Sequence, residues 1–262
     1  MSDLQKKKEA AIPGLIAIPL PLFHKDFPII FFWNPKCGCT SLIKWFYFQI
    51  GILEEANKYS QWVHTYRENV YERQPNYKLD LKNELLNLKK VTCKVTRNPY
   101  KRAVSSYIAT LAMPEIMRQI APDVTQGFSF RQFLYRLEKI GVEREIVNSH
   151  VAQQYIAGEE HFINNYINLE NLNSELRNIE RKYNLLQSPL DVITQSHHHV
   201  AHKMNRNQTV KELVADVNLF SSIRSSKLPP YQNFYDAETK KLVFELYEQD
   251  FIMLGYDPEE SI

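Results

Sequence analysis

A short polar loop with a single lysine separates two apolar runs near the N-terminus. It follows the apolar stretch 27–33 and precedes residues 42–50, whose apolar positions recur at helical spacing. A glycine-containing turn between a buried strand and a helix presents backbone N–H groups and the positive end of the helix dipole to an anion. The lysine adds a full charge, and two hydroxyls follow it, so the spacing predicts a site for a phosphate-like anion. Its candidate binding residues are Lys36, Cys37, Gly38, Cys39, Thr40 and Ser41.

The same arrangement returns between residues 89 and 111. A short strand is predicted to end near Thr96, Arg97 begins the turn, and Pro99 occupies a position that the first turn of a helix tolerates. Arg97 can bind a phosphate through two N–H donors. Ser105 lies eight residues further along, in the predicted helix. Two anion sites of this kind suit a ligand with phosphates at both ends.

Strands that alternate with helices predict an α/β fold, with a parallel β-sheet flanked by helices. The stretch 27–33 is continuously apolar, as expected for a strand that is buried on both faces. Open parallel sheets bind ligands at their carboxyl edge, where both anion loops would lie. No linker or repeat divides the chain, so we expect a single domain over residues 1–262, with an irregular N-terminal segment over residues 1–26.

Cap residues and apolar spacing predict the later elements. One helix is predicted to begin at a Ser129 cap and to end at Gly141, and the last helix should run from near Asp236 to Gly255. A third strand is expected near residues 166–169, with a helix after it. We expect the polar stretch from 194 to 230 to be mostly loop.

The composition limits the partners and the location of the protein. A net charge of +2 does not provide the basic field of nucleic-acid-binding proteins. Three cysteines, two of them one residue apart, do not form a disulfide framework and indicate a reducing compartment. Prolines interrupt the apolar N-terminal run, which disfavours a signal peptide, and no run reaches the ~18 apolar residues of a membrane span. We expect a cytoplasmic protein without a membrane span, whose oligomeric state stays open.

The lysine loop differs from the phosphate loop of nucleoside triphosphatases. That loop places its Lys after the second Gly, whereas Lys36 precedes the only Gly of this turn. No acidic run that would hold magnesium follows it. Three alternatives remain open: an ATP-dependent small-molecule kinase with an atypical phosphate loop, a non-catalytic module that binds phosphorylated ligands, and a turn that binds nothing.

The two motifs together resemble the nucleotide motifs of sulfotransferases. NPKCGCTSL is similar to their 5′-phosphosulfate loop, P-K-x-G-[CT]-[TS], and VTRNPYKRAVSSY is similar to their 3′-phosphate motif, R-[DN]-P-[FY]-x-R-x-x-S-x-[YF]. WVHTY, SHVAQQY, FINNYINLENL and LYEQDFIMLGY resemble later landmarks of the Golgi-type carbohydrate sulfotransferases of family 2, so the resemblance spans about residues 27–256. Asn98 stands where Asp is common. The membrane anchor of Golgi members is absent, which suggests a soluble, bacterial relative.

The resemblance implies a P-loop-like sulfotransferase fold and the donor 3′-phosphoadenosine 5′-phosphosulfate (PAPS), with adenosine 3′,5′-bisphosphate (PAP) as product. A sulfuryl group would pass in line to a hydroxyl or amine of a carbohydrate or glycolipid acceptor, without a metal. Lys36 would stabilise the bridging oxygen as the leaving phosphate gains charge. Backbone N–H groups of residues 38–41 would hold the 5′-phosphate and sulfuryl oxygens, and Arg97 and Ser105 would hold the 3′-phosphate.

An acceptor hydroxyl needs a base, and two histidines are candidates because imidazole titrates near neutral pH. His64 lies between the two nucleotide motifs, in a segment that could return to the phosphosulfate loop. His150 follows the second motif and is the second choice, with contact to the acceptor or donor as its expected role. A carboxylate such as Glu68 is a further alternative.

A cluster of histidines between His197 and His202 also invites a metal interpretation. His198 and His202 would share a helix face, but no Cys or carboxylate cluster accompanies them, and zinc sites usually have three or four ligands. We therefore expect no metal site, and a loop that closes over the adenosine instead. Lys203 and Arg206 could add positive charge to that loop.

Overall fold

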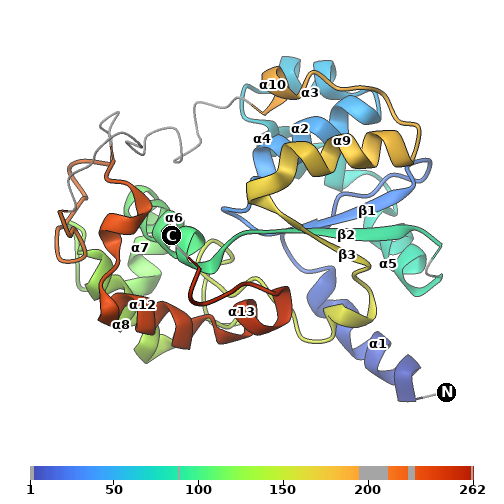
Figure 1. Cartoon of the computed structure of the whole chain (residues 1–262). Helices are drawn as coiled ribbons and strands as arrows, with labels where there is room; N and C mark the ends of the chain where they lie inside the picture. Colours follow the sequence, from blue (N-terminus) through green and yellow to red (C-terminus); the bar gives the residue numbers. More distant parts are fainter. Residues whose placement is uncertain (1–2, 88, 195–211, 224–227, 261) are drawn as a thin grey trace. The chain divides into compact units, whose positions relative to one another are not determined.

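The computed structural model describes residues 3–87, 89–194, 212–223, 228–260 and 262. The chain divides into two compact units, and Figure 1 shows them coloured along the sequence. The sheet unit comprises Met1–Thr96 and Ile156–Ser196, and the helical unit comprises Arg97–Tyr155 and His197–Ile262. Each unit has its own buried apolar side chains. The two units are described separately below, and the prediction of a single domain over residues 1–262 stays a prediction.

The sheet unit contains the predicted parallel sheet. Its strands are β1 (Ile29–Trp33), β2 (Val91–Thr96) and β3 (Asn165–Asn168), and all pairing is parallel in the order β1-β2-β3. Cys93 pairs with Phe31 on one side and with Asn165 on the other, so β2 is the central strand. The predicted α/β fold class and the three predicted strands are confirmed, with strand ends that differ from the predicted ones by at most two residues.

Helices cover both sides of this sheet. Figure 1 shows α2 (Cys39–Gln49) and α9 (Leu172–Lys182) on one side and α1 (Asp3–Leu15) on the other. All five residues of β1 are buried, because helices on both faces exclude water from it. The other helices of the unit are α3 (Leu53–Tyr59), α4 (Val63–Asn69), α5 (Tyr77–Asn87), α10 (Leu190–Ile193) and the short 3-10 turns η1 (Tyr71–Arg73), η2 (Glu159–His161) and η3 (Leu169–Asn171).

The helical unit begins directly after β2. It contains α6 (Pro99–Ala112), α7 (Pro114–Ile120), α8 (Phe130–Ile140), η4 (Tyr231–Phe234), α12 (Ala237–Leu246) and α13 (Glu248–Leu254). Ser129 caps α8 and Asp236 caps α12, and each cap exchanges hydrogen bonds with the third residue of its helix. Both cap predictions are therefore confirmed. Buried aromatic rings from α6, α8 and η4 pack edge to face in the interior of this unit.

Two expectations from the sequence need correction. The N-terminal segment is irregular only over residues 16–26, because residues 3–15 form α1. Its Lys, Glu and Ala residues favour helix, and Pro13 lies close enough to the C-terminal end to be accommodated. The last helix is also not continuous, because the backbone leaves helical geometry at Tyr247. The buried hydroxyl of Tyr247 donates to the backbone oxygen of Val151, which holds the break in place.

Candidate active site

The lysine loop connects the end of β1 to the start of α2 in an uncommon backbone conformation. Cys37 N donates to Asn34 O at 3.2 Å, which closes a tight turn. Lys36 has a φ of 71° and Gly38 a φ of 72°, so both lie in the left-handed region. For a lysine this conformation costs roughly 1–3 kcal/mol and persists only where surrounding structure imposes it. Such strain is concentrated at functional sites, so the conformation of Lys36 supports a role in binding or catalysis.

Gly38 is required at its position for a second reason. A Cβ atom there would lie 2.3 Å from Leu169 Cδ1, which is too close for any side chain without movement of that leucine. Gly38 is also the N-cap of α2 and has no side chain to cap it. The first N–H groups of a helix have no acceptor within the helix. The N-terminus of α2 therefore has the donors and the positive dipole end that an anion requires.

His64 lies against this loop. Its Nε2 atom is 3.4 Å from Thr40 Oγ1 and 3.5 Å from Cys39 Sγ, although 24 and 25 residues separate them in the chain. The imidazole is buried, and α4 supplies it. Burial raises the pKa of the Cys39 thiol, while the charges of Lys36 and Arg67 act in the opposite direction. The sulfur therefore stays a neutral thiol at neutral pH.

Two indole rings flank the imidazole of His64. The ring of Trp62 lies 4.7 Å from it and that of Trp33 lies 5.7 Å from it, measured between centroids. The guanidinium of Arg67 stacks on Trp33 at 4.8 Å and pairs with Glu68 and Glu72. These rings restrict the orientation of the imidazole. Glu68, the alternative base, is engaged by Arg67 in this arrangement.

In the helical unit, Arg97 and Ser105 lie together as the sequence predicts. Arg97 Nη1 donates to Ser105 Oγ at 2.8 Å, and both residues are buried. Arg97 Nη2 donates to the hydroxyl of Tyr231 at 2.8 Å, and the guanidinium also faces the ring of Tyr231 at 5.4 Å. Tyr231 is not among the residues predicted from the sequence. Its position after two prolines carries no local signal of a role.

The backbone of Arg97 is held by the side chain of Gln154. Gln154 Oε1 accepts from Arg97 N and Gln154 Nε2 donates to Arg97 O, each at 2.9 Å. The carboxylate of Asp250, which is fully buried, in turn accepts from Gln154 N, Gln154 Nε2 and Tyr155 N. The two hydrogen bonds from Gln154 to the N–H and the C=O of Arg97 resemble those that a neighbouring β-strand would make. They hold the backbone in place directly after the end of β2. Neither Gln154 nor Asp250 could be identified from sequence spacing.

Asn98 takes the role that Asp has in the usual motif. Its Oδ1 accepts from Lys101 N at 3.2 Å and caps α6, with Pro99 as the first helical residue. Asn and Asp are equally good at this position. The departure from the motif therefore leaves the geometry of the turn unchanged.

The remaining histidine predictions concern His150 and the His197–His202 cluster. His150 lies in the helical unit, where its Nδ1 is 2.9 Å from Asn148 Oδ1 and its backbone oxygen accepts from Ser106 Oγ. The His197–His202 cluster, with Lys203 and Arg206, lies outside the described residues. In the part of the chain that is described, no group of three or more His, Cys, Asp or Glu could hold a metal ion.

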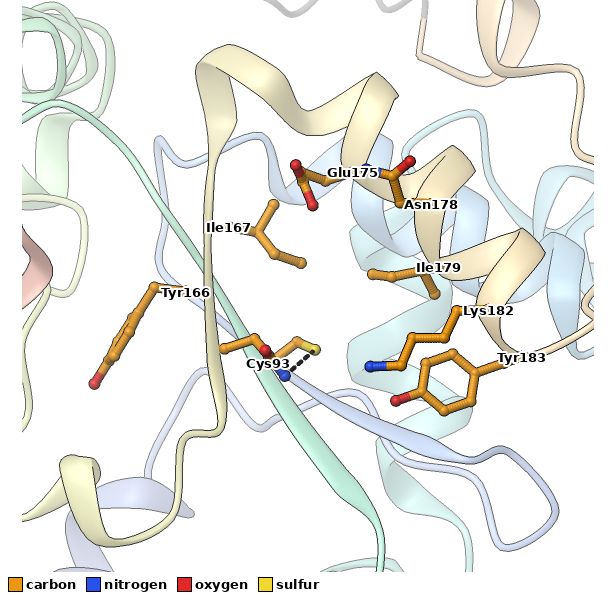
Figure 2. Close-up of a pocket in the computed structure, with 9 residues that line it drawn as sticks. Cys93, Tyr166, Ile167, Glu175, Asn178, Ile179, Lys182 and Tyr183 are labelled. Carbon is orange, nitrogen blue, oxygen red and sulfur yellow. Dashed lines mark hydrogen bonds between the residues drawn. The ribbon is translucent and has the colours of Figure 1, made fainter.

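A cavity of about 180 Å³ lies elsewhere in the sheet unit. Figure 2 shows it between β2, β3 and α9, with Cys93, Ile167 and Ile179 among its lining residues and Glu175 and Lys182 at its margin. None of the predicted site residues lines it. Burial raises the pKa of its Cys93 thiol to about 11.

A family model described as "Sulfotransferase family" matches residues 22–257, nearly the whole chain and both anion motifs. The chain belongs to the sulfotransferase family. The predicted resemblance of the chain to the family 2 sulfotransferases is thereby confirmed. No curated protein and no solved structure matches this sulfotransferase. None of the helices described for it is long and apolar enough to cross a membrane.

Proposed function

We propose that this sulfotransferase moves a sulfuryl group from PAPS to a hydroxyl or amine of a carbohydrate or glycolipid acceptor. The observation that carries the proposal is the strained Lys36 loop at the N-terminus of α2, with His64 Nε2 beside it. A cation, helix-end N–H groups and an imidazole together provide what an in-line transfer between two oxygens needs. Such a transfer depends on positioning and charge stabilisation.

The lysine loop would bind the sulfuryl end of the donor. Backbone N–H groups at the start of α2, with Thr40 and Ser41, would hold the 5′-phosphate and sulfuryl oxygens. Lys36 would donate to the oxygen that bridges sulfur and phosphorus, where negative charge grows as the S–O bond breaks. The left-handed backbone of Lys36 supports this role, because strained backbone conformations are concentrated at active sites and ligand-binding loops.

Arg97 and Ser105 would bind the 3′-phosphate. The guanidinium offers several N–H donors in a fixed plane, and Tyr231 supports the same group. A 3′-phosphate would be recognised by these donors, and ATP, which lacks one, would be bound less well. Gln154 would act on the site indirectly, by holding the backbone of Arg97.

His64 would be the general base. Its Nε2 atom would accept the proton of the acceptor hydroxyl while the oxygen forms its bond to sulfur, and PAP would leave with the electron pair of the broken S–O bond. His150 would contact the acceptor or the donor. The scheme needs no metal. The free thiols of Cys37, Cys39 and Cys93 agree with a reducing compartment, and we propose the cytoplasm.

A thermal-shift assay tests the donor part of this proposal. Ligands that bind the native state raise the melting temperature, so PAP should raise it and adenosine 5′-phosphate should raise it less. Stabilisation by magnesium-ATP without stabilisation by PAP would instead favour the kinase alternative. Incubation with labelled PAPS and libraries of glycans, lipids and phenols would then identify the acceptor. PAP binding without any labelled product would leave the binding module as the better description.

A further inference from the structure

The indole of Trp62 is exposed to solvent directly beside the proposed base. Trp62 is 38% exposed, whereas the other two tryptophans, Trp33 and Trp45, are 5% and 0% exposed. The centroid of its ring lies 4.7 Å from that of the His64 imidazole, with the two planes inclined by 35°. Single exposed aromatic rings are common on protein surfaces. This one differs because it packs on the imidazole, so its open part lies next to the atoms that we assign to the acceptor.

The backbone holds Trp62 in place on both sides. Trp62 is the N-cap of α4, and its backbone oxygen accepts from Thr65 N at 2.9 Å. Its backbone nitrogen donates to Ser60 Oγ at 3.1 Å. A ligand that binds the ring would therefore lose little affinity to the ordering of a loop, which is the usual benefit of a preorganised contact.

The chemistry of residues 59–62 suits a sugar ring. The segment reads Tyr-Ser-Gln-Trp, with two exposed aromatic rings, an exposed amide and no charged side chain. One face of a pyranose carries C–H groups, whose partial positive charge matches the negative face of an indole. Its hydroxyls need both donors and acceptors, and the amide of Gln61 offers both. A flexible lipid chain has no such flat face.

We propose that a pyranose ring of the acceptor stacks on Trp62, beside the hydroxyl whose proton His64 accepts. Stacking fixes the orientation of the sugar and with it the choice of hydroxyl, so Trp62 determines acceptor specificity without a contact to the donor. The role of that hydroxyl rests on the proposed sulfuryl transfer. The binding of a sugar to Trp62 does not, and it can be measured without turnover.

Quenching of tryptophan fluorescence by acrylamide tests the stacking in the wild-type chain. Acrylamide reaches exposed indoles, so the quenched emission should come from Trp62, and Trp62→Phe should remove it. The probes are the methyl β-glycosides of glucose, galactose and N-acetylglucosamine, each with and without PAP. Mannitol, which has the hydroxyls but no ring, is the control. We expect a glycoside to protect Trp62 and mannitol to leave it accessible. Equal protection by mannitol, or no protection by any of the glycosides, would overturn the proposal.

Two variants separate stacking on the acceptor from packing on His64. With the acceptor that labelled PAPS identifies, Trp62→Ala should raise the acceptor KM by at least about 10-fold and leave PAP affinity unchanged, because it removes the ring that binds the sugar. Trp62→Phe keeps a ring on the imidazole, so it should keep the acidic limb of the rate profile and raise KM by a smaller factor. Tyr135→Ala, which removes a ring that is 37% exposed on α8, should change neither. A lower kcat with an unchanged KM in Trp62→Ala would show that the ring only holds the imidazole, and would overturn the proposal.

The outcomes also separate this inference from the proposed function. If PAP raises the melting temperature and labelled PAPS gives products only with acceptors that contain no sugar, the donor site stands and the role of Trp62 falls. If a glycoside protects Trp62 and no acceptor receives label from PAPS, the sugar site stands and the proposed function falls.

Discussion

The Nε2 atom of His64 lies 3.4 Å from the hydroxyl oxygen of Thr40, the second residue of α2. This relationship places an imidazole at the end of the helix whose N-terminus we assign to the sulfuryl group. An acceptor hydroxyl that approaches the same helix end would meet both the electrophile and a proton acceptor. The pair therefore defines where an attacking oxygen would have to lie.

Replacement of His64 should affect the chemical step. His64→Ala should lower kcat by roughly 10²- to 10⁴-fold, the usual contribution of a positioned base, and should remove the acidic limb of the rate profile. PAP affinity should change little, because a base acts in the transition state. His150→Ala should mainly raise the acceptor KM, and His161→Ala serves as a control. If neither His64 nor His150 changes kcat more than a few-fold, a carboxylate such as Glu68 acts as base, or no side chain does.

Two replacements of Lys36 should lower turnover equally but differ in the stability of the folded chain. Lys36→Ala should lower kcat by about 100-fold or more, as the loss of one preorganised charge-stabilising group does, with a smaller effect on PAP affinity. Lys36→Gly should be equally slow and yet more stable than Lys36→Ala by about 1 kcal/mol, because glycine adopts a φ of 71° without strain. Kinetics and urea unfolding measure the two effects, with Lys58→Ala as the control. Near-normal turnover of either Lys36 variant would refute the assignment.

Replacement of Arg97 should discriminate between two nucleotides. Arg97→Ala should weaken the binding of PAP much more than that of adenosine 5′-phosphate, because only PAP carries the 3′-phosphate. Calorimetric titration of both nucleotides measures the difference. Arg118→Ala, which removes an exposed arginine of α7, should leave both affinities unchanged. An equal loss for the two nucleotides would show that Arg97 does not bind the 3′-phosphate.

Replacement of Gln154 should act through Arg97. Gln154→Leu removes both hydrogen bonds to the Arg97 backbone and leaves Asp250 with fewer donors, so it should destabilise the chain by about 1–3 kcal/mol. The ratio of PAP affinity to adenosine 5′-phosphate affinity should fall as well. Gln153→Leu changes the neighbouring residue in the same way and is the matched control. A loss of stability with an unchanged nucleotide ratio would make Gln154 a purely structural residue.

Replacement of Asp236 should reveal a pH-dependent contribution to stability. Burial tends to raise the pKa of Asp236, but hydrogen bonds from Arg131 and Thr239 outweigh it and lower the pKa to about 2. A carboxyl group whose pKa falls on folding stabilises the native state above its unfolded pKa of about 3.9, and the effect disappears as the pH falls towards 2. Asp236→Asn keeps a good cap and loses the charge, whereas Asp236→Ala loses both and should cost about 1 kcal/mol more.

Urea unfolding of these variants at two pH values checks the prediction. The stability difference between wild type and Asp236→Asn should be larger near pH 6 than near pH 3, because near pH 3 the carboxyl of the unfolded chain is already largely protonated whereas the folded one, with its pKa of about 2, is still ionised. A stability difference that grew on acidification would contradict the lowered pKa of Asp236 in the folded chain. Arg131→Met should likewise make the stability depend less on pH between 3 and 6. Arg131 pairs with Asp216 and Glu238 as well as with Asp236, so its loss removes the ion pairs of all three carboxylates.

Local patterns in the sequence determined the elements and the two anion motifs. A continuous run of apolar residues is typical of a strand buried on both faces, so β1 could be predicted without tertiary information. Ser129 and Asp236 precede helices whose third residues complete their caps, and Pro99 begins a helix, because each of these signals acts within a few residues. Gly38 was found for the same reason, since a left-handed turn favours glycine wherever it occurs.

Tertiary structure alone decided which side chains meet. The Cys39–His64 contact spans 25 residues and the Gln154–Arg97 hydrogen bonds span 57, and no periodicity or spacing encodes such pairs. They depend on how the helices pack around the sheet and on which buried polar groups find partners. The break at Tyr247 has the same origin, because a hydrogen bond to Val151, 96 residues away, acts at a position where the apolar spacing continues through the break. Propensity describes a residue and its neighbours, whereas a site is made by residues that packing brings together.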